Sequence, residues 1–325
     1  MLLLSPSDLT ALLTPMRCIG AMEEVFKGLA DGHYFLPLRG RAAPDDSPNW
    51  ITWMPTLRTA DPRRWALKEM VVTPLNSERA GIDPIQGVVI LQDGEDGRLL
   101  AIADAPTLTT LRTAATTALA TRTFAPPDSR IVTILGTGIQ GRSHVNALRA
   151  VLPDARFRSW GRNPANTARF AAETGCEAFT DIEAAVADAD VVCTVTASLE
   201  PVLRREWLKP VCHLNAVGSS RPVARELDAA TVAAAELFVD RREAALNEAG
   251  EIVSALREGA IGPDHIRAEL GEVLTSRRPG RRPESTFTLY KSLGLGALDL
   301  GALDLAWQLA RSQGLGQSVN WEHAV

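Results

Sequence analysis

The feature that most constrains the fold is a glycine motif between a strand and a helix. Residues 130–136, RIVTILG, read as a buried strand, and residues 141–152, GRSHVNALRAVL, have the apolar spacing of a helix. Between them, Gly136, Gly138 and Gly141 form G-x-G-x-x-G. In this context the motif predicts a Rossmann-type domain, in which the helix N-terminus faces a pyrophosphate. A glycine-rich turn that binds no nucleotide is the alternative.

The pattern on both sides of the motif predicts a parallel sheet. Further strands are expected at 156–161, 190–197, 211–218 and 237–241. Helices are expected at 166–175, ended by Gly175, and at 181–189, begun by Asp181 as N-cap. Strands spaced by helices are typical of right-handed βαβ units.

The first 120 residues have a different pattern. Strands are expected at 50–57, 65–73, 85–93 and 99–105, with turn signals between them. This indicates a mixed or antiparallel α+β unit. Residues 296–314 read as an apolar helix that contains a tandem GALDL, and the pattern alone does not show where this helix packs.

Composition excludes several classes of function. The formal net charge of −5 argues against nucleic acid as a partner, and the basic run at 277–282 contains Pro and Gly, which indicates a solvated loop. Four cysteines without C-x-x-C spacing indicate neither a zinc site nor a disulfide framework, and we expect no metal. The start MLLLSPSDL lacks the features of a signal peptide, and no apolar run reaches about 18 residues. We therefore expect a cytoplasmic protein without a membrane segment.

The end of the second strand of the Rossmann domain indicates the cofactor. An NAD site needs an acid there for the ribose 2′-hydroxyl, but the sequence has Gly161, followed by Arg162 and Asn163. Arg162 is suited to pair with a 2′-phosphate. We expect NADPH rather than NADH, with Arg162 facing only water as the alternative.

Three cations are candidates for holding a substrate carboxylate. Lys68 lies in the strand WALKEMVV between apolar alternation partners, so we expect it to point inward, although most lysines are exposed. Arg39 and Arg112 lie elsewhere in the first 120 residues. Sequence spacing alone does not bring the three together.

A polar loop follows the strand at 211–218. In LNAVGSSRPVAREL the strand ends at Gly218, and Ser219 and Ser220 offer two hydroxyls but no carboxylate. Ligands usually bind at the carboxyl ends of strands in such sheets, so this loop is a candidate part of the site.

The chain resembles the ornithine cyclodeaminase/mu-crystallin family over nearly its whole length. The stretches that carry the resemblance are LPLR, ALKEMVV, IQGVVIL, GRLLAIADAPTLTTLRTAA, ILGTGIQGRSH, LNAVGSSRPVARELD, VDRREAALNEAGEI, AELGEV and TLYKSLG. The resemblance implies an α/β fold and a homodimer. Residues 1–122 with 296–325 would form a substrate-binding and dimerisation domain, and residues 123–295 a Rossmann domain.

The resemblance also implies roles for individual residues. Arg39, Lys68 and Arg112 match the family's carboxylate-binding and catalytic positions. Ser220 stands where ornithine cyclodeaminases have an aspartate, and it is shared with the ketimine reductase branch, as is Glu248. The residues expected to contact the cofactor are Gln86, Gly136, Thr137, Gly138, Ile139, Gln140, Gly141, Gly161, Arg162, Asn163, Thr196, Val217 and Ser292.

These observations predict an enzyme that uses NADPH to reduce a cyclic ketimine carboxylic acid, of the Δ1-pyrroline-2-carboxylate or Δ1-piperideine-2-carboxylate type, to the cyclic imino acid. Three alternatives stay open. They are a cyclodeaminase, an amino-acid or opine-type dehydrogenase, and a protein that binds a small molecule without turnover.

Overall fold

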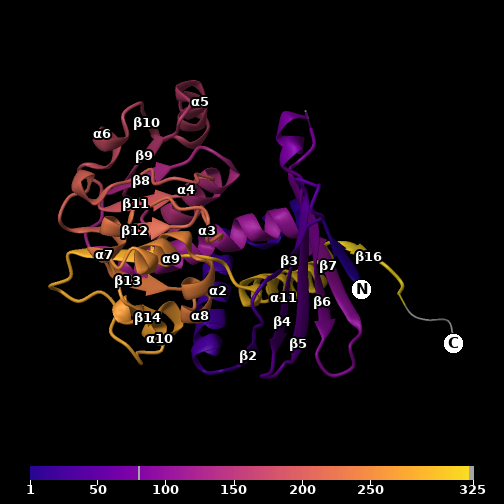
Figure 1. Cartoon of the computed structure of the whole chain (residues 1–325). Coiled ribbons are helices and arrows are strands. Elements are labelled where there is room, and N and C mark those ends of the chain that lie inside the picture. The colour runs from indigo at the N-terminus through magenta and orange to yellow at the C-terminus, as the bar shows by residue number, and fades with distance from the viewer. Residues whose placement is uncertain (80, 322–325) are drawn as a thin grey trace. The chain divides into compact units, whose positions relative to one another are not determined.

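The computed structural model describes residues 1–79 and 81–321, and the chain divides into two compact units (Figure 1). The first unit combines Met1–Arg112 with Leu295–Val325, and the second is Thr113–Gly294. The chain passes between the units within helix α3 (Ala105–Phe124) and again between Gly294 and Leu295. The domain boundaries predicted from the sequence were 122/123 and 295/296. The expected α/β class is confirmed.

The first unit is built around a mixed sheet of eight strands. Its order is β16-β1-β7-β6-β5-β4-β2, with β3 also paired to β4, and β1 runs parallel to β7 while the other pairs are antiparallel. The strands are β1 (Leu2–Leu4), β2 (Tyr34–Phe35), β3 (Gly40–Ala42), β4 (Trp50–Arg58), β5 (Arg64–Val72), β6 (Ile85–Asp93), β7 (Leu99–Asp104) and β16 (Gln317–Ser318). A short 3-10 helix, η1 (Pro74–Glu78), lies between β5 and β6.

Three helices complete the first unit. They are α1 (Pro6–Leu12), α2 (Pro15–Ala30) and α11 (Gly296–Gln313). Helix α11, the yellow helix of Figure 1, packs against β4, β5 and α2, so the C-terminal helix joins elements made from the first hundred residues.

The side chains on the two faces of β5 differ in how exposed they are. Ala66 and Lys68 are buried, whereas Trp65, Leu67 and Val71 are 49%, 36% and 39% exposed. Because side chains alternate along a strand, the exposed three lie on the face opposite Lys68. We call this face, which carries Trp65, Leu67 and Val71, the outer face of the sheet.

The second unit contains the expected parallel sheet. All eight strands are parallel, in the order β10-β9-β8-β11-β12-β15-β13-β14. Strands β8, β11, β12 and β15 are buried along their whole length, as expected of a sheet covered on both faces. The strands are β8 (Ile131–Leu135), β9 (Arg156–Trp160), β10 (Glu177–Phe179), β11 (Val191–Thr194), β12 (Cys212–Ala216), β13 (Glu236–Val239), β14 (Ile266–Glu269) and β15 (Phe287–Lys291).

Local signals begin and end the helices of this unit. Asp181 caps the helix that follows it by accepting from the Ala184 amide at 2.8 Å, and Gly175, with φ 68°, ends the preceding helix, as the sequence predicted. The helices are α4 (Ile139–Val151), α5 (Pro164–Thr174), α6 (Ile182–Val186), α7 (Ala229–Ala233), α8 (Arg242–Glu248), α9 (Gly250–Arg257) and α10 (Leu270–Leu274), with 3-10 turns η2 (Arg205–Trp207) and η3 (Pro263–His265).

Candidate functional site

The glycine loop between β8 and α4 fits a dinucleotide phosphate group. Gly136 has φ 125°, and a β-carbon there would lie 2.8 Å from the Val195 carbonyl oxygen. A β-carbon on Gly141 would lie 2.3 Å from the Gly136 carbonyl oxygen, so α4 packs directly on the turn. Gly138 is the N-cap of α4, and a β-carbon there would meet no atom within 4 Å. The loop therefore leaves open space at a helix N-terminus, where amide groups and the helix dipole favour an anion.

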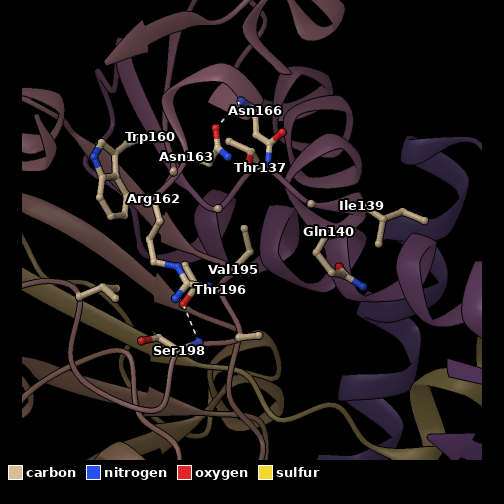
Figure 2. A pocket seen from close by; sticks show the side chains of 15 residues that line it. Thr137, Ile139, Gln140, Trp160, Arg162, Asn163, Asn166, Val195, Thr196 and Ser198 are labelled. Atoms are coloured by element: carbon tan, nitrogen blue, oxygen red, sulfur yellow. Dashed lines mark hydrogen bonds between the residues drawn. The ribbon is translucent and has the colours of Figure 1, made fainter. Parts of the chain in front are cut away.

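A cavity of about 410 Å³ opens beside this loop (Figure 2). Its walls follow three neighbouring strands, β9, β8 and β11, at their carboxyl ends. The lining residues are Gly136, Thr137, Gly138, Ile139, Gln140, Trp160, Gly161, Arg162, Asn163, Asn166, Val195, Thr196, Ala197, Ser198 and Val202.

Arg162 is placed in this pocket without an acidic neighbour to neutralise it. Figure 2 shows its side chain extending from the end of β9 toward Thr196 and Ser198. The side chain is exposed, and among residues 1–79 and 81–321 it has no hydrogen-bond or ion-pair partner. A guanidinium in this state can pair with an added phosphate without breaking an existing ion pair.

The two residues beside Arg162 have structural tasks. The Asn163 side-chain oxygen caps α5 by accepting from the amides of Ala165 and Asn166 at 2.9 and 3.2 Å. A β-carbon on Gly161 would lie 3.0 Å from Thr137 Cγ2 and 3.1 Å from the Thr167 hydroxyl. Gly161, which stands where NAD sites have an acid, is therefore tightly packed and carries no charge.

A buried carboxylate ties the far wall of the pocket to the loop after β12. Glu226 accepts from the amides of Thr196 and Gly218 at 2.6 and 2.7 Å, and from the Thr194 hydroxyl at 2.7 Å. Burial raises the pKa of Glu226, an effect that the charge of Lys291 opposes. Two loops at the carboxyl edge of the sheet are thus held by one side chain.

The two serines of this second loop differ. The Ser219 hydroxyl is buried and donates to the Ala224 carbonyl oxygen at 2.6 Å, while the Ser219 carbonyl accepts from Lys291 Nζ at 2.6 Å. The Ser220 side chain is half-buried and has no hydrogen-bond partner in the described part of the chain. Ser219 is therefore a structural residue of the loop, and Ser220 is the hydroxyl that can meet a ligand.

The first unit contains a buried cluster of two cations and an acid. Lys68 Nζ donates to Asp299 Oδ2 at 2.6 Å, and Arg112 Nε donates to Asp299 Oδ1 at 3.0 Å. The three side chains are 2%, 5% and 1% exposed. Lys68 thus points inward, and the structure brings it to Arg112 although 44 positions separate them in the chain (112 − 68).

Electrostatics lower the pKa of Lys68 to about 8. The largest cause is burial, and the charges of Arg112 and Arg39 act in the same direction, whereas Asp299 opposes them through its charge and its hydrogen bond. For Asp299, burial raises the pKa, but Arg112 and Lys68 outweigh this and hold it below its ordinary value. The cluster is an ionised acid beside a lysine that can change its protonation state near neutral pH.

Sequence reasoning missed Asp299 and six pocket residues. Asp299 stands in the first GALDL of the apolar helix α11, and a carboxylate on the buried face of such a helix is a signal for a cation partner. Val195, Ala197 and Ser198 directly follow β11 at the sheet edge, and this position would have indicated them together with the predicted Thr196. The missed pocket residues are Trp160, Asn166, Val195, Ala197, Ser198 and Val202.

Other expected site residues lie outside the pocket and the cluster. Gln86, on β6, is exposed and donates to the Asp83 carbonyl at 3.4 Å. Val217 and Glu248 are half-buried, and Ser292 is buried with its hydroxyl 3.5 Å from Asp240 Oδ2. Within the described residues there is no group of His, Cys, Asp or Glu suited to a metal, and no helix long and apolar enough to cross a membrane.

Comparisons with known proteins agree with this geometry. Residues 2–314 match the model of the ornithine cyclodeaminase/mu-crystallin family. The ketimine reductase mu-crystallin of Mus musculus is 40% identical over 224 residues, which are 68% of this chain and 69% of the mouse protein. A solved Δ1-pyrroline-2-carboxylate reductase of Thermococcus litoralis, in complex with NADH and L-proline, has a TM-score of 0.92 and 32% identity, covering 98% of this chain and 100% of that one. An archaeal alanine dehydrogenase dimer with bound NAD has a TM-score of 0.91 and 27% identity, covering 99% of both chains.

Proposed function

Because the chain belongs to the ornithine cyclodeaminase/mu-crystallin family, we propose that it uses NADPH to reduce a cyclic ketimine carboxylic acid to the cyclic imino acid. The broader class, an NAD(P)H-dependent oxidoreductase acting on carbon–nitrogen bonds, is shown by the relatives. The observation that carries the finer proposal is the buried cluster of Lys68, Arg112 and Asp299, which suits an anionic substrate that must gain a proton.

The pocket of the second unit would hold the cofactor. The amides of the glycine loop and of the first turn of α4 would bind the pyrophosphate, and Arg162 would pair with the 2′-phosphate of NADPH. Thr196 would line the wall that Glu226 supports. When bound, the reduced nicotinamide supplies the hydride. The solved relatives bind NADH or NAD, which supports a nicotinamide cofactor, and the proposed preference for NADPH rests on Arg162 alone.

Arg112 and Arg39 would bind the substrate carboxylate. The charges of both arginines lower the pKa of Lys68, which supports assigning them to the same substrate group. A carboxylate bound there fixes the carbon of the C=N bond that receives hydride, and such positioning supplies several kcal/mol of a barrier, at about 1.4 kcal/mol per tenfold in rate. The T. litoralis relative was captured with L-proline, which carries both a carboxylate and a ring nitrogen.

Lys68 would supply the proton. In the overall reaction the C=N π bond breaks, a C–H and an N–H bond form, and one NADPH and one proton are consumed per imino acid produced. A lysine whose pKa is about 8 can give up that proton and be reprotonated at neutral pH. Ser220 would hydrogen-bond the ring nitrogen or a water beside it, and Glu248 would balance positive charge near the substrate.

The test is a substrate panel with purified protein. We expect NADPH oxidation with Δ1-pyrroline-2-carboxylate or Δ1-piperideine-2-carboxylate, little with open-chain 2-oxo acids plus ammonia, and no ammonia release from ornithine. Lys68→Met should abolish turnover while leaving NADPH binding, followed by cofactor fluorescence, intact. Efficient use of pyruvate and ammonia would favour instead an amino-acid dehydrogenase, the activity of the archaeal relative.

We also propose that the protein is a homodimer. The outer face of the sheet exposes Ile51, Trp53, Trp65, Leu67 and Val71 between 36% and 49%, on two adjacent strands. Five large apolar side chains on one sheet face form a patch of the kind that monomers rarely expose. A second copy of the chain would bury it through a two-fold contact.

A further inference from the structure

We propose that Asp299 is a positioning residue that keeps Lys68 able to change its protonation state, so that the arriving substrate carboxylate drives Lys68 to take up the proton that the imine nitrogen needs. This inference rests on the proposed function. It assigns a role to an acid in the C-terminal helix, 231 residues from the lysine that it contacts.

Three charged groups act most strongly on Lys68. Its cross-strand neighbours on β4 and β6 are Met54 and Val89, which carry none. The charged groups are Asp299 from α11, Arg112 from α3 and Arg39 from the segment before β3. On α2, Cys18 lies within reach of Arg112, and burial raises its pKa to about 12, so it stays a neutral thiol.

The charges around Lys68 show why an added anion matters. The nearby charges of Arg112 and Arg39 disfavour protonation of the buried Lys68, and the charge of Asp299 favours it. A substrate carboxylate adds a second anion, which favours the charged form of Lys68 and raises its pKa. Binding and proton uptake are then linked.

Asp299 sets the pH range in which substrate binding can change the protonation of Lys68. Burial and both arginines lower the pKa of Lys68, and Asp299 opposes them through its charge and its hydrogen bond. Without that carboxylate the protonated fraction of Lys68 at neutral pH should fall, so fewer molecules would hold a proton to give. With its hydrogen bond of 2.6 Å, Asp299 also fixes the direction of the ammonium group. The two effects make it a positioning residue, because it acts through Lys68.

The chain contains a matched control in the second half of its tandem GALDL. Asp304 is also buried on α11 and accepts from Arg58 Nη2 at 2.7 Å and Arg64 Nε at 3.2 Å. Both of its partners are arginines, which do not release a proton in proteins. Asp299 and Asp304 thus each pair with two cations, but Lys68, a partner of Asp299, is the one cation of the four that titrates near neutral pH.

The test follows the lysines directly by NMR. The sequence contains only four, Lys27, Lys68, Lys209 and Lys291, so ε-¹³C labelling gives four resolvable signals, and Lys68→Arg identifies the relevant one. In unliganded protein we expect Lys68 to titrate with a midpoint near pH 8. Asp299→Asn should lower that midpoint by at least about one pH unit, and Asp299→Glu should restore most of it.

The control variant separates charge coupling from loss of stability. Asp304→Asn should lower the melting temperature as much as Asp299→Asn does, yet leave the Lys68 midpoint within about 0.3 pH units of the unmutated protein. An unchanged midpoint in Asp299→Asn, or an equal shift in Asp304→Asn, would overturn the proposal.

The second arm adds a carboxylate that cannot be reduced. Saturating pyrrole-2-carboxylate should raise the Lys68 midpoint by at least about one pH unit, whereas the neutral pyrrole-2-carboxamide should not. In kinetics, kcat/KM should fall as pH rises through the pKa of Lys68, because the protonated form is required. Asp299→Asn should move this decline to lower pH, with a loss of about fivefold at pH 8 that shrinks toward pH 6.

The outcomes distinguish failure of the proposed function from failure of the role assigned to Asp299. Absence of turnover with every ketimine acid, together with the expected shift in unliganded Asp299→Asn, would refute the proposed function alone. Turnover with a pH profile that Asp299→Asn leaves unmoved, or an analogue that binds without raising the midpoint, would refute the role of Asp299.

Discussion

Replacement of Arg162 by alanine should remove most of the preference for NADPH over NADH. The guanidinium lines the pocket beside the glycine loop, is exposed, and has no partner in the described chain. Its removal therefore breaks no internal contact, and the loss reports the pairing with the 2′-phosphate. NADH lacks this phosphate, so its use should change by less than about twofold.

The size of the effect follows from the exposure of the site. A hydrogen bond to a charged group contributes about 1.5–3 kcal/mol, and solvent screening places Arg162 near the lower end. At about 1.4 kcal/mol per tenfold, the ratio of kcat/KM for NADPH to that for NADH should fall by about 10- to 30-fold. The loss should appear mainly in KM for NADPH, and added salt should diminish the preference of the unmutated protein.

The assay needs a control of equal charge. Arg156 begins the same strand β9, is exposed, and does not line the pocket. Arg156→Ala should leave both KM values unchanged. The reasoning is refuted if Arg162→Ala keeps the unmutated cofactor ratio, or if Arg156→Ala loses as much. Gly161→Asp should not yield a good NADH enzyme, because a β-carbon there already crowds Thr137 and Thr167.

Further variants test the substrate side, the loop and the dimer. Arg112→Ala should lower kcat/KM for a ketimine acid by about 30- to 1000-fold with NADPH affinity unchanged, because truncating a buried charged partner costs about 2–4 kcal/mol; equal activity would refute the carboxylate assignment. Ser220→Ala should reduce kcat/KM by no more than about tenfold without a change in melting temperature, whereas Ser219→Ala should lower the melting temperature, because it removes a buried hydrogen bond to a carbonyl. Leu67→Arg should convert a dimer to a 35.0 kDa monomer in light scattering, and Val223→Arg, which alters an apolar residue 77% exposed in the other unit, should not; a dimer that survives Leu67→Arg would exclude the outer face.

The sequence predicted those parts of the molecule whose signals are local. The glycine loop, the strand before it and the helix after it occupy neighbouring residues, and their order alone implied the pocket near Arg162. The alternation in WALKEMVV likewise implied that Lys68 points inward, which its 2% exposure bears out. The four longest strands of the first unit, β4 to β7, were recognised because turn signals separate them, whereas the short strands β1, β2, β3 and β16 were not predicted.

Pairings between distant segments could not be read in the same way. Asp299 contacts Lys68 and Arg112 only because α11 packs across β4 and β5, and no local pattern encodes that packing. Helix α2 has buried residues at helical spacing but was not predicted. Strand β15 was not predicted either, and chain order does not indicate its place between β12 and β13, because both precede it in the chain.

The construction of the first unit from both chain ends has a consequence for biosynthesis. A ribosome completes residues 113–294, the whole second unit, before α11 emerges, so that unit can fold while the first still lacks its last helix. Until then Lys68 and Arg112 lack the Asp299 carboxylate that both contact in the folded unit, and burying a cation without its acid is costly. A chain that stops before Asp299 should therefore fail to close this cluster. The C-terminal helix thereby makes folding of the first unit depend on translation beyond Asp299.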